Sequence, residues 1–101
     1  MNSTKILIVA KYFYDDSMLK ALIRHLKKLS QLDTFFLKNN ERPRSLKNSI
    51  NLRFKKKIQK EKYDIVIIWN NILLDEELDL INKNTITFGI LNGFSGMYID
   101  T

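Results

Sequence analysis

The chain of 101 residues contains no cysteine, one histidine, one proline and three glycines. Without cysteine there is no disulfide framework, no thiolate zinc site, no iron–sulfur cluster and no cysteine nucleophile. Because a single histidine also excludes a histidine-rich metal site, we expect no metal centre, and we expect no cofactor. The shortage of proline and glycine argues against a flexible linker or a collagen-like chain. The length then predicts one domain spanning residues 1–101.

Long apolar stretches are absent as well. The longest runs, residues 6–10 and 65–69, are each five residues long, whereas a transmembrane helix needs about 20. The first of these runs is also too short for the apolar region of a signal peptide. We therefore expect no transmembrane segment and a cytoplasmic location.

Positive charge is concentrated in the middle of the chain. The formal net charge is +6, from 17 basic and 11 acidic residues. Residues 34–63 hold ten Lys or Arg against two Glu, a net charge of +8, while residues 64–101 have a net charge of −5. Charge is therefore distributed unevenly along the chain.

Apolar residues alternate between strand-like and helix-like spacing along the chain. The segments that predict strands are residues 6–10, 32–37, 65–69 and 85–91. The segments that predict helices are residues 17–29, 45–62 and 75–84. Strands that alternate with helices indicate a parallel sheet with right-handed crossovers. We predict an α/β fold, a Rossmann-like or flavodoxin-like open parallel sheet of about four strands in the order 2-1-3-4, with three helices.

Each of the two longer helices is expected to bury one apolar stripe. The stripe of the first helix is Met18, Leu19, Leu22, Ile23, Leu26 and Leu29, and that of the second is Leu46, Ile50, Phe54 and Ile58. Ser45 is the predicted N-cap of the second helix. His25 is expected at the boundary of the first stripe, where we assign it no catalytic role.

Ligands of such sheets bind outside the carboxyl ends of the strands, near the point where the strand order reverses. The loops after the first, third and fourth strands meet at this rim. Our candidate ligand-binding residues there are Tyr12, Tyr14, Asp15, Asp16, Asn70, Asn71, Asn92 and Ser95. Aromatic rings stack on sugars or bases, and carboxylates and amides bind hydroxyl groups. The same residue types also cap helices and form turns, and the sequence leaves both interpretations open, as it does for Trp69.

Three types of site that hold a phosphate or phosphoryl group are excluded at this rim. Residues 10–15 contain no glycine, so the glycine-rich dinucleotide fingerprint is missing, and the glycine-lysine phosphate loop is also absent. A phosphoacceptor receiver needs an acidic pair at the end of the first strand, but Asp15 and Asp16 come too late. Such a receiver also needs an aspartate where this chain has Trp69. No catalytic residue can be named.

The predicted helix over residues 45–62 has one strongly basic face. That face comprises Lys47, Arg53, Lys55, Lys56, Lys57, Lys60 and Lys62. Lysines of this kind bind nucleic acid by releasing counterions from phosphates. Since no aromatic platform accompanies them, a solvated helix face is the favoured interpretation, and nucleic acid is kept as an alternative partner.

Three stretches carry a family resemblance. They are residues 5–10 with the aromatic loop that follows, residues 18–37, and the lysine-rich segment 60–68 with the short acidic helix at 74–81. Together they resemble the N-terminal half of GT-B glycosyltransferases, in particular the spore-maturation protein CgeB-like group. The similarity covers most of the chain and lies mainly in the core pattern.

The resemblance implies an acceptor-side half-domain with a sugar or glycan acceptor at its rim. Transfer from a nucleotide-sugar would need a second Rossmann-like domain, so we expect residues 1–101 to be inactive alone. With no crossover helix after the fourth strand, we expect exposed apolar surface around residues 85–94 and self-association at that edge. A small flavodoxin-like ligand-binding or regulatory module and a nucleic-acid-associated domain are the alternatives.

Overall fold

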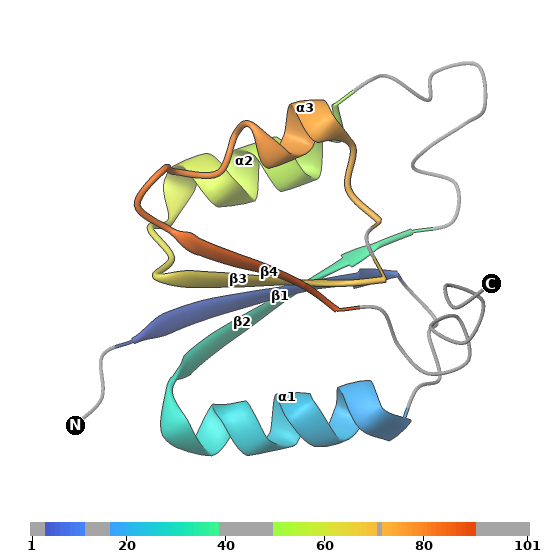
Figure 1. Ribbon diagram of the computed structural model, residues 1–101, viewed down its shortest axis with the longest axis vertical. Helices are drawn as coiled ribbons and strands as arrows, with labels where there is room; N and C mark the ends of the chain where they lie inside the picture. The colour runs from blue at the N-terminus through green and yellow to red at the C-terminus, as the bar shows by residue number, and fades with distance from the viewer. Residues whose placement is uncertain (1–3, 12–16, 39–49, 71, 91–101) are drawn as a thin grey trace, which may run out of the picture.

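The computed structural model describes residues 4–11, 17–38, 50–70 and 72–90. The elements follow the chain as β1 (Lys5–Lys11), α1 (Ser17–Leu29), β2 (Gln31–Leu37), α2 (Leu52–Lys60), β3 (Ile65–Trp69), α3 (Asp75–Leu78) and β4 (Ile86–Ile90) (Figure 1). Strands and helices alternate throughout, as the hydrophobic spacing predicts.

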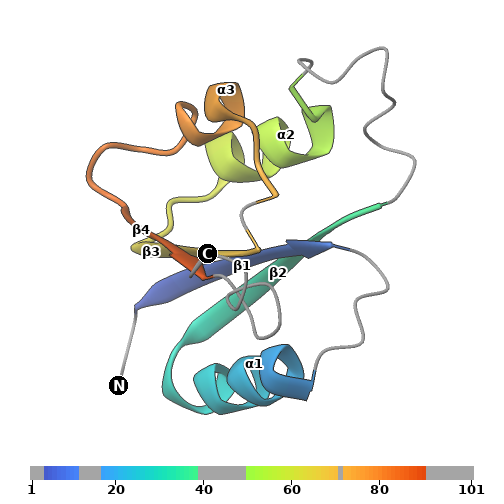
Figure 2. The same cartoon turned by 45° about the vertical axis from the view of Figure 1, so that its right-hand side comes forward.

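The four strands form one all-parallel sheet in the order β2-β1-β3-β4, which confirms the predicted fold class. The two strands whose residues are apolar on both faces, β1 and β3, are adjacent at the centre, with Ile6 opposite Ile65 and Val9 opposite Ile68. α1 covers one face of the sheet, and α2 and α3 cover the other (Figures 1 and 2). Burial on both faces explains why residues 6–10 form a continuous apolar run.

Alternate residues of the central strands enter two separate cores. The core on the α1 side contains Ile6, Ile8, Ala10, Leu19, Ile67 and Trp69. The core on the side of α2 and α3 contains Leu7, Val9, Phe35, Leu37, Phe54, Ile58, Tyr63, Val66, Ile68 and Leu73. The edge strand β2 adds Phe35 and Leu37 to the second core, where Phe35 and Phe54 meet edge to face at 5.6 Å.

The second helix begins later than predicted, at Leu52 instead of next to Ser45. Asn51 is its N-cap, because the Asn51 side chain accepts a hydrogen bond of 2.9 Å from the Phe54 N–H. Ile50 therefore precedes the helix, and only Phe54 and Ile58 of the predicted stripe lie buried within it. Ser45 and Leu46 lie outside the described residues.

The apolar stripe of α1 is shorter than predicted. Leu19 is buried and Leu22, Ile23 and Leu26 pack against the core, while Met18 and Leu29, at the two ends of the helix, are 62% and 55% exposed.

The predicted strand and helix bounds are otherwise close to those observed, with one exception. α3 ends at Leu78 and not near residues 82–84, because the backbone bonds that follow it tighten into turns.

β4 is the most exposed strand. Its register with β3 places Ile86, Phe88 and Ile90 on the α1 side of the sheet. Only Ile90 packs against that core, whereas Ile86 is 57% and Phe88 is 51% exposed. The prediction of exposed apolar surface on this strand is therefore confirmed up to Ile90, and the remainder of the predicted patch lies outside the described residues.

In the part of the chain that the structure describes, no helix has the length and apolar character needed to cross a membrane.

Candidate functional site

The carboxyl ends of the strands form the edge at which the sequence predicts a ligand rim. β1 ends at Lys11, β3 at Trp69 and β4 at Ile90. From β1 the chain passes to β2 on one side of it and then returns to β3 on the other side. The strand order therefore reverses between β1 and β3, which is the position where open α/β sheets bind ligands.

Asn70 lies at this reversal point, directly after β3. Its backbone has a φ of 62°, in the left-handed region that asparagine tolerates better than most residues. The Asn70 N–H donates a hydrogen bond of 2.6 Å to the carbonyl oxygen of Ile90. The ends of β3 and β4 are thereby joined, and the partly exposed Asn70 is fixed at the rim.

Trp69 is not available to a ligand at this edge. Its side chain is 3% exposed and belongs to the core on the α1 side, together with Ile67 and Ala10. The hypothesis that this ring joins the neighbouring amides in binding is therefore wrong. The alternation of Ile65, Ile67 and Trp69 along one face of β3 is the signal that accounts for its burial.

The other predicted rim residues lie outside the described part of the chain. They are Tyr12, Tyr14, Asp15, Asp16, Asn71, Asn92 and Ser95. Their grouping with Asn70 therefore stays a prediction from the sequence. His25, for which no catalytic role was predicted, is exposed on α1.

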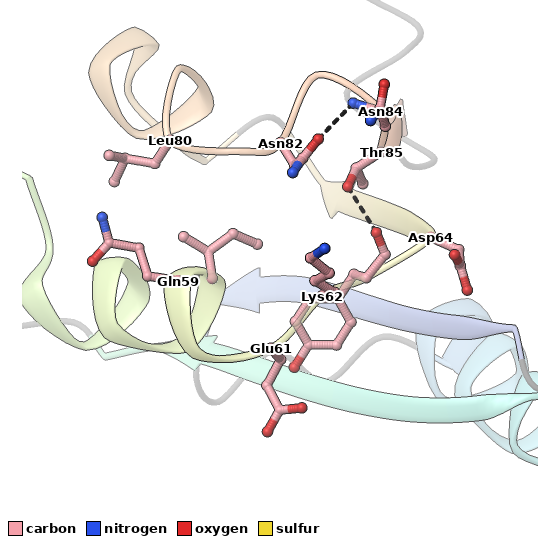
Figure 3. A pocket seen from close by; sticks show the side chains of 10 residues that line it. Gln59, Glu61, Lys62, Asp64, Leu80, Asn82, Asn84 and Thr85 are labelled. Carbon is pink, nitrogen blue, oxygen red and sulfur yellow. Dashed lines mark hydrogen bonds between the residues drawn. The ribbon is translucent and has the colours of Figure 1, made fainter.

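A hollow of about 360 Å³ lies at the opposite edge, beside the amino ends of β3 and β4 (Figure 3). It is lined by Ile58, Gln59, Glu61, Lys62, Tyr63, Asp64, Leu80, Asn82, Asn84 and Thr85. The Asn82 side-chain oxygen accepts from the Asn84 N–H at 2.8 Å, and the Thr85 hydroxyl donates to the Tyr63 carbonyl at 2.7 Å. These bonds shape the turn before β4, so we interpret this hollow as structural.

A network of charged and polar side chains links β1, β2 and the segment between α2 and β3. The Lys5 ammonium forms an ion pair with Glu61, and the Tyr63 hydroxyl donates to Asp33 at 2.6 Å. The hydrogen bond with Glu61 raises the pKa of Lys5, and the same bond lowers the pKa of Glu61. Burial, followed by the bond to Asp33, raises the pKa of Tyr63. Because each side chain of the network is paired with another by an ion pair or a hydrogen bond, we interpret the network as structural.

Glu77 is a fully buried carboxylate that no sequence pattern marked as a site residue. Its two oxygens accept backbone hydrogen bonds from Asn51 at 2.7 Å and from Leu74 at 2.9 Å. It thereby joins the N-terminus of α2 to that of α3. The sequence signal was present, since Glu77 is one of three acids in a first helical turn, but nothing marked it as the buried one.

Among the described residues no group of three or more His, Cys, Asp or Glu could hold a metal ion. The carboxyl edge, where the strand order reverses and the Asn70 N–H is bonded to Ile90, is the candidate ligand site. Searches of family models, curated proteins and solved structures found no match to this chain.

Proposed function

We propose that this chain is the acceptor-side, Rossmann-like half of a GT-B glycosyltransferase, holding a sugar or glycan acceptor at the carboxyl edge of the sheet. The observation that carries the proposal is the reversal of strand order between β1 and β3, with Asn70 fixed at that point. In open α/β sheets this is where ligands bind.

The chemistry of Asn70 suits a hydroxyl-rich ligand. An amide presents both a donor and an acceptor, so that it matches sugar hydroxyl groups, which also do both. The left-handed backbone and the bond to Ile90 hold the residue in one orientation. Tyr12 and Asp16, which follow β1 in the sequence and lie outside the described residues, are the proposed sources of a stacking ring and a carboxylate.

The exposed face of β4 supports the half-domain part of the proposal. Ile86 and Phe88 extend the apolar face of the sheet beyond the area that α1 covers. Large apolar side chains exposed side by side are typical of surfaces that meet another layer or domain.

Sugar transfer requires the donor and the acceptor to be held together, since positioning supplies much of the rate. We therefore expect residues 1–101 to bind an acceptor weakly and to transfer no sugar alone.

The test is calorimetric titration of the chain with monosaccharides, oligosaccharides and nucleotide-sugars. The informative variant is Asn70→Gly, because glycine removes the amide and still accepts a φ of 62°. Loss of one hydrogen bond of about 1 kcal/mol should weaken acceptor binding about fivefold. Gln59→Ala, which removes an exposed amide from α2 at the opposite edge, is the control and should change nothing.

Two results would contradict the proposal. One is sugar binding that Asn70→Gly and Gln59→Ala leave equally unchanged. The other is turnover, or tight binding of a nucleotide-sugar, by residues 1–101 alone, because either would require a complete donor site within this one domain.

A further inference from the structure

A basic groove of about 500 Å³ lies between the edge strand β2 and α2. Its lining residues are Thr34, Phe35, Phe36, Lys38, Arg53, Lys56, Lys57, Lys60 and Glu61. Five of these are basic and one is acidic, a net charge of +4 (5 − 1). A concave surface of one charge sign concentrates ligands of the opposite sign.

The amphipathic spacing of α2 produces this groove. Arg53, Lys56, Lys57 and Lys60 recur at intervals of three, one and three residues, which places them on one side of the helix. From the first to the last they span about 10 Å along the helix axis, at about 1.5 Å per residue. The apolar residues of the same helix, Phe54 and Ile58, are buried in the core. The basic stripe therefore lies along the length of the groove instead of converging on one point.

Two of the basic residues hold the walls of the groove together. The Arg53 guanidinium donates to the Phe36 carbonyl oxygen at 2.8 Å and lies over the Phe35 ring, 4.5 Å from its centroid. The Lys57 ammonium is 3.9 Å from a carboxylate oxygen of Asp33 on β2. These contacts join α2 to the edge strand. The exposed Lys38, Lys56 and Lys60 then line the opening.

The shape and chemistry of the groove determine what kind of anion fits it. Positive charges spread over about 10 Å suit a chain of phosphates better than a single phosphate group. The Phe35 ring is 4% exposed and offers no platform on which a base could stack. A membrane surface would need a row of exposed apolar side chains on α2 beside the lysines, but Phe54 and Ile58 face the core and Leu52 alone of the apolar residues of α2 is exposed.

We propose that the groove between β2 and α2 binds single-stranded nucleic acid through its phosphodiester backbone, without reading its sequence. Lys38, Lys56 and Lys60 contact phosphates, while Arg53 positions the helix against β2. This site lies away from the carboxyl edge, and the inference does not depend on the proposed glycosyltransferase function.

The test is fluorescence anisotropy of a labelled twelve-nucleotide oligo-uridine at several salt concentrations. For single strands the slope of log K against log salt is about −0.7 per phosphate neutralised. With three phosphates, one each for Lys38, Lys56 and Lys60, the slope should be about −2.1, so that raising salt from 50 to 200 mM weakens binding about 18-fold. Oligo-deoxythymidine should bind similarly, because the contacts are to the backbone.

The double variant Lys56→Ala/Lys60→Ala should reduce the slope to about −0.7, and the same salt increase should then weaken binding only about 2.6-fold. The control, Lys27→Ala/Lys28→Ala, removes the same charge from the exposed end of α1, across the sheet. Circular dichroism checks that both variants fold.

Three results would overturn the inference. The first is no binding at 25 mM salt. The second is an equal loss in the two double variants, which would make net charge and not the groove responsible. The third is binding to anionic vesicles with none to either oligonucleotide.

Discussion

Removing the Glu77 carboxylate should destabilise the protein more than any exposed acid does. The two carboxylate oxygens accept hydrogen bonds from the N–H groups of Asn51 and Leu74, and the residue is 0% exposed. A hydrogen bond to a charged group contributes about 1.5–3 kcal/mol, so Glu77→Ala should lower the free energy of unfolding by about 3–6 kcal/mol. A domain of this size has about 5–15 kcal/mol in total.

Urea denaturation followed by circular dichroism measures this loss. Glu77→Gln is the milder variant, because its remaining oxygen can accept one of the two bonds, and it should cost about 1.5–3 kcal/mol. Glu76→Ala is the matched control, since Glu76 is the exposed neighbour in the same turn, and it should change stability by less than about 0.5 kcal/mol. If Glu77→Ala and Glu76→Ala have equal effects, the bridge between α2 and α3 does not stabilise the fold as argued.

Two further predictions concern the charged network and the exposed edge. The bond with Lys5 lowers the pKa of Glu61 in the folded protein. The ion pair therefore stabilises the fold fully above the pKa of an unfolded glutamate, about 4.3, and this stabilisation is lost as pH falls through the lower pKa of folded Glu61. NMR titration should show that the pKa of Glu61 rises in Lys5→Gln, and an unchanged pKa would contradict this. Phe88→Lys should reduce concentration-dependent self-association in sedimentation velocity, and Leu52→Lys, which changes an exposed leucine on α2, is the control. A wild-type protein that stays monomeric at high concentration would refute the expected association through β4.

The fold was predictable because its central strands are apolar on both faces. Residues 6–10 and 65–69 have no polar side to present to water, which is typical of strands in a parallel sheet with helices on both faces. The start of α2 was not predictable in the same way. Ser45 and Asn51 are both good N-caps, and the structure uses Asn51, whose N–H is bonded by Glu77, 26 residues further along the chain.

The candidate site was predictable in position but not in detail. The end of β3 marked Asn70 as a rim residue, whereas its left-handed backbone and its bond to Ile90 depend on how β3 and β4 pair. The excess of lysine in the middle of the chain was equally visible. That Arg53 and Lys57 face β2 and form a groove with it follows only from the packing of Phe54 against Phe35.

The most direct test of the proposed function is a two-dimensional amide NMR titration of the chain with candidate acceptor sugars. The proposal predicts that the largest shift changes fall on the amides of Lys11, Asn70 and Ile90, which lie at the carboxyl ends of β1, β3 and β4. The same sugars should move these signals less in Asn70→Gly. Shift changes confined to the hollow near Asn82, or to α2 between Arg53 and Lys60, would contradict an acceptor site at this edge.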